Sequence, residues 1–398
     1  MPISVRLLQL FAFLNRLELW DAVYGLFMLR QGFTLGQLAV LSSLWYVTSV
    51  LFEVPTGAFA DRYGMKLSLL LSLLLQALAF WLMAATRSFP VAALAFLLWG
   101  LSCSFETGTY SALLYDSLKE AGREQDYGRI HGQLCSLQVL ASALGGALAG
   151  QIATRGLGLP LVSTAALALL LCPLVLLLHE PHVAAERESS YGLQIRESVG
   201  YVSRHRVVAL LLLYAAVMGA VGWGLRIFYQ PLMDSFRVPV QRIGLFYLLF
   251  NLTGAAGALY ATRLYRVLGL TLMYLMPLAL LVAVTSLGVF VTPGIVGLIA
   301  VPFLVEGMYE SLLDALLNER IPSGKRATIL SVNPLISGLL AITTHPILGR
   351  IGDKVSLQMV FLVVAAATLL SMALILALLR REAAEAWSAP NASRTCAP

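Results

Sequence analysis

Hydrophobic residues occur along this chain in blocks of about twenty, separated by short polar segments. A helical block of that length crosses a hydrocarbon core of about 30 Å. Stretches such as 67–78 are apolar without the alternation that marks the strands of a membrane β-barrel. We therefore predict an all-α polytopic membrane protein with about twelve transmembrane helices. The predicted spans cover residues 7–29, 35–56, 67–86, 90–117, 128–153, 158–178, 207–231, 241–262, 268–291, 294–319, 327–349 and 356–379.

One polar segment is much longer than the others and divides the spans into two sets of six. The predicted organisation is a six-helix bundle over 1–178, a linker over 179–206, a second six-helix bundle over 207–380 and a tail over 381–398. A weak internal repeat supports the division: Glu106 to Asp116 in the fourth span resembles Glu306 to Asp314 in the tenth. Two halves related in this way are typical of secondary transporters.

The distribution of basic residues predicts the orientation. An even number of spans places both termini on one side of the membrane, and that side holds about eighteen of the 27 Lys and Arg residues against about seven on the other. Both termini are therefore predicted to be cytoplasmic, in the cell membrane of a bacterial-type cell. The net charge of +6 is explained by this bias, and no basic soluble domain is present to bind nucleic acid.

A short charged segment, residues 57–66, separates the second and third spans and is expected to form a turn at the water interface. Its sequence, Gly-Ala-Phe-Ala-Asp-Arg-Tyr-Gly-Met-Lys, resembles the loop signature of the major facilitator superfamily (MFS), which reads approximately Gly-x-Leu-Ala-Asp-Arg-x-Gly-Arg-Lys. The matching positions are Gly57, Ala60, Asp61, Arg62, Gly64 and Lys66. Position 65 differs, because Met stands where the family has Arg.

The resemblance implies a conformational latch as well as the MFS fold. It implies that Asp61 caps the start of the eleventh helix and holds the two halves together in the outward-open state. The partner that the family supplies for the position of Asp116 would be residue 65, which is Met here. Arg62 or Lys66 could take its place, and the alternative is that these charges only determine topology.

Ionisable residues inside the predicted spans are the candidates for transport chemistry, because each is costly in a bilayer and usually faces a cavity or a partner. They lie on the first, fourth, seventh and tenth helices, which line the central cavity in the superfamily. In a continuous first helix Arg16 would point away from Glu18, so Arg16 is not expected to neutralise it. The predicted cavity residues are Arg16, Glu18, Asp21, Glu106, Arg226, Glu306 and Glu310.

Glu306 and Glu310 lie one helical turn apart, and like charges at this spacing repel in a low dielectric. One of the two is expected to hold a proton unless Arg226 or a cationic substrate compensates. The alternative for the whole set is structural ion pairing between helices. His345 is interpreted as a packed or hydrogen-bonded histidine rather than a ligand.

The sequence contains no zinc, dinucleotide, phosphate-loop or nucleophile motif, so we predict neither an enzyme nor a cofactor or metal site. The leading hypothesis is a monomeric, proton-coupled antiporter that exports a small organic compound, cationic or zwitterionic, by alternating access. An uptake permease, working as a proton symporter or a uniporter, is the main alternative. A non-transporting scaffold or sensor is a third hypothesis, and the buried carboxylates argue against it.

Overall fold

The computed structural model describes residues 3–181, 200–321 and 332–388, and within these ranges all regular structure is helical. Eleven of the described helices are long and apolar enough to span a membrane. The first predicted span is present as two shorter helices, α1 and α2, so the prediction of about twelve spans is confirmed. The linker residues 182–199 and the tail residues 389–398 lie outside the described ranges.

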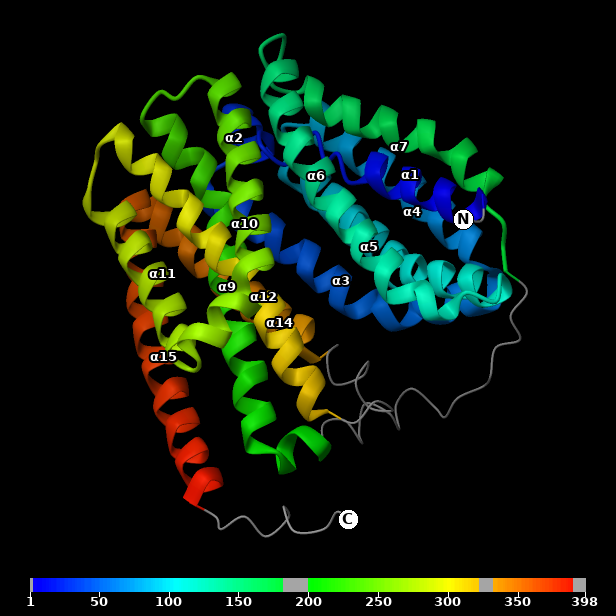
Figure 1. The fold of residues 1–398 in the computed structure, drawn as a ribbon. Coiled ribbons are helices and arrows are strands. Elements are labelled where there is room, and N and C mark those ends of the chain that lie inside the picture. Colours follow the sequence, from blue (N-terminus) through cyan, green and yellow to red (C-terminus); the bar gives the residue numbers. More distant parts are fainter. Residues whose placement is uncertain (1–2, 182–199, 322–331, 389–398) are drawn as a thin grey trace, which may run out of the picture.

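The helices form two bundles (Figure 1). The first bundle contains α1 (Ile3–Asn15), α2 (Tyr24–Arg30), α3 (Leu35–Tyr63), α4 (Met65–Ala85), α5 (Phe89–Glu120), the short η1 (Glu124–Asp126), α6 (Tyr127–Ala153) and α7 (Leu159–Leu177). The second contains α9 (Arg206–Ser235), α10 (Val240–Leu268), α11 (Thr271–Val289), the short η2 (Pro293–Ile299), α12 (Ala300–Arg320), α14 (Val332–Lys354) and α15 (Leu357–Ser388).

Local sequence signals explain several helix boundaries. Thr34 and Gln37 form a capping box at the start of α3, in which each side chain accepts from the other residue's backbone N–H. A proline in the first turn begins both α5 and α7, where the missing N–H has no cost. Gly64, with φ of 102°, separates α3 from α4, because that conformation is available to glycine without strain.

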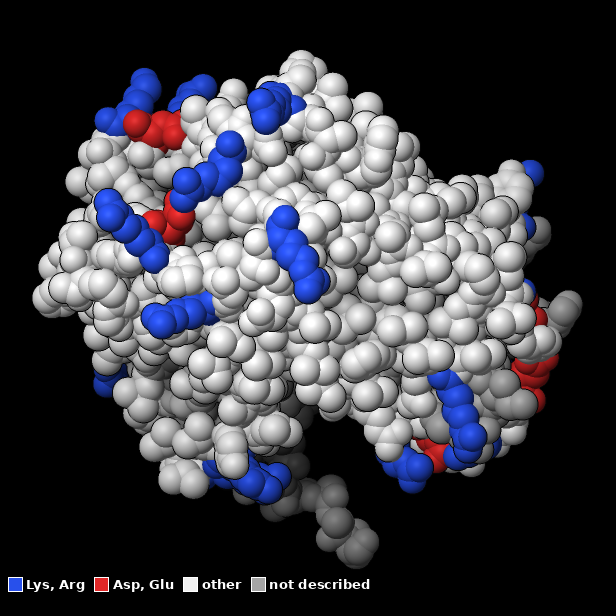
Figure 2. Space-filling model, turned by 90° about the horizontal axis from the view of Figure 1, so that it is seen from above, with Lys and Arg blue, Asp and Glu red and all other residues white. Residues whose placement is uncertain are grey.

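The two bundles touch on one side of the molecule and diverge toward the side where α1 begins and α15 ends (Figure 1). We call the side where the bundles diverge the terminal side, and the side where they touch the distal side. Most of the contact is made by two antiparallel helix pairs, α3 with α14 and α6 with α10, and α2 also contacts α9. Seen from the distal side, basic side chains are spread over one part of the surface, some beside acidic ones, while a broad uncharged surface lies next to them (Figure 2).

Glycines permit this contact between the bundles. A Cβ atom on Gly349 of α14 would lie 2.6 Å from the Cβ of Ala39 on α3. A Cβ on Gly244 of α10 would lie 2.7 Å from the Cα of Gly150 on α6. Such distances leave room only for hydrogen, so small residues set the close approach of both helix pairs, as is common between transmembrane helices.

Candidate functional site

The first span is interrupted in the middle, and this break shapes the site. Helix α1 ends at Asn15 and α2 begins at Tyr24, with Glu18 between them in the left-handed conformation, φ 43°. The prediction of one continuous helix over 7–29 is therefore wrong. The broken segment is packed against α6, where a Cβ on Gly145 would overlap the carbonyl oxygen of Leu17 at 1.3 Å.

The break also corrects the prediction for Arg16. Its Nη1 lies 2.8 Å from Oε1 of Glu18, so the two form an ion pair. Residues two apart lie on opposite faces of a helix, but the turn that replaces the helix lets these side chains meet. The Arg16 side chain is 49% exposed and that of Glu18 is 21% exposed. An arginine that is half exposed in the middle of a span is consistent with a water-filled space between the bundles.

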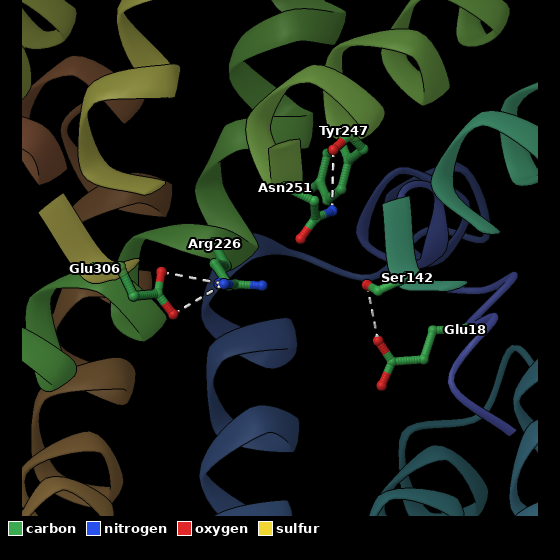
Figure 3. Close-up of polar contacts among 6 residues, drawn as sticks. All are labelled: Glu18, Ser142, Arg226, Tyr247, Asn251 and Glu306. Atoms are coloured by element: carbon green, nitrogen blue, oxygen red, sulfur yellow. Dashed lines mark hydrogen bonds and ion pairs between the residues drawn. The ribbon is translucent and has the colours of Figure 1, made fainter. Parts of the chain in front are cut away.

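Two other helices of the first bundle contribute to this group. Ser142 of α6 donates to Oε2 of Glu18 at 3.2 Å, which holds the second carboxylate oxygen (Figure 3). Glu106 of α5 lies near Asn15 and interacts electrostatically with Arg16 and Glu18. The structure thus brings together three of the predicted residues, two acidic and one basic.

The second bundle contains a more enclosed ion pair. Arg226 of α9 donates through Nη2 to both carboxylate oxygens of Glu306 on α12, at 2.9 and 3.1 Å (Figure 3). The guanidinium carbon also lies 4.4 Å from the ring centre of Trp223 and 4.6 Å from that of Phe303. The Nε of Arg226 is buried without a hydrogen-bond partner among the described residues. Three neighbours therefore fix the position of the guanidinium and leave part of its donor capacity unused.

Asp21 lies between the two groups. It interacts electrostatically with Arg226 and Glu306 on one side and with Glu18 on the other. Glu310 interacts with Glu306 and Arg226 but is more exposed than Glu306. Within the described part of the chain neither Asp21, Glu106 nor Glu310 forms an ion pair, whereas Glu18 and Glu306 each do. The site therefore has an excess of carboxylates.

His345 of α14 lies in the contact between the bundles. It is 1% exposed, and its ring meets that of Tyr46 on α3 edge to face at 5.5 Å between centres. Neither ring nitrogen has a hydrogen-bond partner among the described residues. The interpretation as a packed histidine agrees with this burial, and the side chain touches no acidic residue by a hydrogen bond or ion pair.

The segment 57–66 lies on the terminal side, where it is mostly helical. α3 continues to Tyr63, so the predicted turn is reduced to Gly64, and Gly57 lies inside the helix. Glu180 caps the start of α4 by accepting from the backbone N–H groups of Met65 and Lys66. An acidic cap at a helix start is favoured by the unpaired N–H groups and by the helix dipole.

The residues of the predicted latch lie close to each other and form no polar contact with the second bundle within the described ranges. Asp61 and Asp116 interact electrostatically, and Asp61 and Arg62 are exposed. The ammonium group of Lys66 donates to the backbone carbonyl of Leu176 in its own bundle at 2.8 Å. In the described ranges no hydrogen bond or ion pair joins these residues to the second bundle, which agrees with the separation of the bundles on this side.

Polar contacts on the distal side close the molecule there, and the sequence did not reveal them. Arg30 of α2 donates to both carboxylate oxygens of Asp234 on α9, at 2.7 and 3.1 Å. Asp353 of α14 accepts from the Thr34 hydroxyl at 2.7 Å and from the Gly36 N–H at 3.0 Å, at the start of α3. Both acidic residues follow apolar spans, where a charge is ordinary, so the sequence carried no signal for them.

Two bundles closed on one side, with charged side chains in the middle of the spans between them, define a multi-pass membrane transporter. The sequence model of the Major Facilitator Superfamily matches residues 10–344. The chain belongs to this superfamily.

Several characterised and uncharacterised members are similar to it. The chain is 20% identical, over 87% of its length and 88% of the relative's, to the uncharacterised MFS-type transporter YxaM of Bacillus subtilis (strain 168). Its fold matches the crystal structure of the nucleoside transporter NupG with a TM-score of 0.80 and 15% identity, over 94% of this chain and 99% of that one. A bacterial homologue of the iron transporter ferroportin in an inward-facing state matches with a TM-score of 0.68 and 18% identity, over 95% of this chain and 100% of that one.

Proposed function

We propose that the protein is a proton-coupled antiporter that exports a small organic cation or zwitterion by alternating access. The observation that carries the proposal is the set of three cavity carboxylates, Asp21, Glu106 and Glu310, that have no ion-pair partner in the described structure. A carboxylate without a cation at mid-membrane must either bind a proton or bind a cationic group. Exchange of one for the other is the chemistry of an antiporter.

Glu310 is the best candidate for the exchangeable proton. Its neighbour Glu306 is already neutralised by the bidentate contact with Arg226. Glu310 lies one turn further along α12, interacts with that pair, and is exposed. A cationic substrate group that approached Glu310 would displace the proton. The half-exposed Arg16 could receive the carboxylate of a zwitterion.

The proposed orientation places the terminal side in the cytoplasm, at the inner face of the cell membrane. The excess of basic residues on that side supports it. With this orientation the structure corresponds to an inward-open state, closed on the outside by Arg30, Asp234 and Asp353. The units 1–178, 179–206, 207–380 and 381–398 act in a single monomer, and Asp61 and its neighbours form the latch of the opposite state.

Purified protein in liposomes with a pH-sensitive dye inside tests the proposal. With an acidic lumen, external addition of a substrate should release luminal protons and raise the luminal pH. A panel of organic cations and amino-acid-like zwitterions is the probe. Glu310→Gln should abolish proton release but preserve exchange of labelled against unlabelled substrate, since exchange moves no net proton. Asp314→Asn, one turn further along the same helix and exposed, is the matched control and should behave as wild type.

The outcomes separate the alternatives. Normal proton release by Glu310→Gln would move the proton site to Glu106 or Asp21, which are tested as Glu106→Gln and Asp21→Asn. Retention of proton release by all three variants would contradict coupling at these carboxylates. No proton movement with any compound, in either gradient direction, would contradict proton coupling and leave a uniporter or a scaffold, and the absence of labelled-substrate exchange as well would favour the scaffold hypothesis.

Uptake by proton symport is the second candidate, and the likeness to the fold of NupG, a nucleoside transporter, motivates its test. Nucleosides are therefore included in the panel. The direction of proton movement distinguishes symport from antiport. A symporter carries protons in the same direction as the substrate, so external substrate would acidify a neutral lumen. An antiporter would instead raise the pH of an acidic lumen.

A further inference from the structure

Gln230 of α9 joins the broken first span to the second bundle. The residue is fully buried, at 0% exposed, and lies one helical turn beyond Arg226. Its Oε1 accepts from the backbone N–H of Leu26 at 3.1 Å. Its Nε2 donates to the backbone carbonyl of Asp21 at 2.6 Å and to the hydroxyl of Tyr247 at 3.0 Å. A single side-chain amide thus binds one backbone donor and one backbone acceptor across the contact between the bundles.

The break in the first span is what makes these two backbone groups available. In a continuous helix the Asp21 carbonyl would accept from Gly25, and the Leu26 N–H would donate to Ala22. The residue that precedes α2, Val23, provides no side-chain cap. The amide of Gln230 therefore replaces the partners that the break removes, where an unpaired backbone group would be costly.

The residues around the Gln230 amide leave space for it and fix its orientation. A Cβ on Gly25 would lie 3.0 Å from Oε1 of Gln230, so the absence of a side chain at that position lets the amide approach α2. The orientation of the amide is fixed, because the Leu26 N–H can only donate and the Asp21 carbonyl can only accept. All the hydrogen-bonding groups of this contact are paired.

We propose that Gln230 is a positioning residue that couples the cavity carboxylate Asp21 to closure of the distal side. The amide can hold Asp21 and α2 only while the bundles are in contact, so opening of the distal side must break both bonds. The break would release the segment that carries Asp21, and the carboxylate would lose its fixed place beside Arg226. This coupling requires only that the distal side opens and closes, and it does not depend on the identity of the substrate or the coupled ion.

The proposal is tested by measuring the distance between the bundles on the distal side. Spin labels on cysteines that replace Ser88 and Thr292, both exposed in distal loops of opposite bundles, report the separation in a variant free of native cysteines. The purified full-length protein is measured without added substrate. Gln230→Leu removes the two hydrogen bonds to the first span, together with the one to Tyr247, and keeps a similar volume. We expect the ratio of the distal-open to the distal-closed population to rise at least tenfold.

Gln230→Glu gives a readout that a space-filling role would not produce. A protonated carboxyl group at position 230 can accept from Leu26 and donate to Asp21, as the amide does, whereas the ionised group cannot donate. The Gln230 amide binds Asp21 and Tyr247, and Tyr24 interacts electrostatically with both of these residues and with Tyr46 and Arg226. Arg226 and Asp234, the partner of Arg30, lie one helical turn before and after Gln230. The variant should match the wild-type distances at about pH 5 and shift to the distal-open population toward about pH 9, the range over which a buried Glu titrates.

Gln241→Glu is the control, because the Gln241 side chain is exposed near the distal end of α10 and forms no hydrogen bond with the described residues. It should show the wild-type pH response. Wild-type distance distributions for both Gln230→Leu and Gln230→Glu at every pH would overturn the proposal. If Gln230→Leu fails to fold, the return of Gln230→Glu to wild-type distances at low pH still tests the proposal. The distance measurement needs no substrate or coupled ion. A negative result in the transport assays would therefore count against the proposed antiport function and not against the role of Gln230.

Discussion

The ion pair between Arg226 and Glu306 offers the sharpest test of how the second bundle is held together. The change is Arg226→Gln, alone and combined with Glu306→Gln. The single variant leaves Glu306, which is 8% exposed as a whole residue, without its two hydrogen bonds. The double variant places two neutral amides at the same positions, and these can hydrogen-bond to each other.

The structure sets the magnitude. Loss of one partner from a buried ion pair costs about 3–5 kcal/mol, and the 19% and 11% side-chain exposures of Arg226 and Glu306 place this site near the lower end. Loss of the contacts to Trp223 and Phe303 adds about 0.5–1 kcal/mol each. Glu306→Gln should cost less, about 1.5–3 kcal/mol, because Arg226 keeps both rings and the attraction of Asp21. We expect a coupling energy of about 2 kcal/mol from the complete double-mutant cycle.

The measurement is the free energy of unfolding in mixed detergent micelles, under conditions where unfolding is reversible. The matched control is the pair Arg206 and Glu382, which joins α9 to α15 at 3.3 Å with the arginine 78% exposed. Its coupling energy should be at most about 1 kcal/mol, as for other surface pairs. A coupling for Arg226 and Glu306 no larger than that of the control would refute the view that this pair organises the site.

Three further predictions concern the broken span, the latch and the orientation. Gly145→Ala should destabilise the protein by about 1–3 kcal/mol or more, measured as a lower unfolding temperature, because a Cβ would overlap a carbonyl of the broken segment. Asp61→Asn should increase the terminal-open population, measured as a wider distance between cysteine labels on that side; an unchanged distance with normal transport would leave the loop as a topology determinant. A cysteine at Thr292 should react with a membrane-impermeant maleimide on whole cells while one at Glu124 should not, and the reverse pattern would invert the orientation.

The number, order and approximate ends of the spans could be predicted because they depend on a local property. An apolar block of sufficient length has no stable state in a bilayer other than a helix, whatever surrounds it. The same reasoning identified the charges that interrupt these blocks. Among the residues it selected, Arg226 and Glu306 are joined by an ion pair within the second bundle.

The break in the first span could not be predicted, because its causes lie elsewhere in the chain. Residues 16–23 contain neither proline nor glycine, the usual local signals for a helix break. The structure that replaces the helix is stabilised by Gln230, by the hydroxyl of Ser142 and by the space above Gly145. These partners lie more than a hundred residues away, and helical geometry alone therefore gave the wrong relation between Arg16 and Glu18.

The distribution of paired and unpaired polar groups connects the site to the conformational cycle. On the distal side Arg30, Asp353 and Gln230 all bind groups of the opposite bundle, and each contact must break for that side to open. On the terminal side Asp61 and Asp116 lie close enough to repel each other. Neither forms a hydrogen bond or ion pair with the described residues of the second bundle. The latch hypothesis predicts that Asp61 gains a partner in the second bundle when the terminal side closes. The cavity carboxylates lie between the two sets of contacts, and Asp21 is attached through its backbone to the distal one. In the proposed coupling through Gln230, a proton or cation that binds at Asp21 acts on the distal contact directly, and it acts on the terminal side only through the rigid-body motion of the bundles.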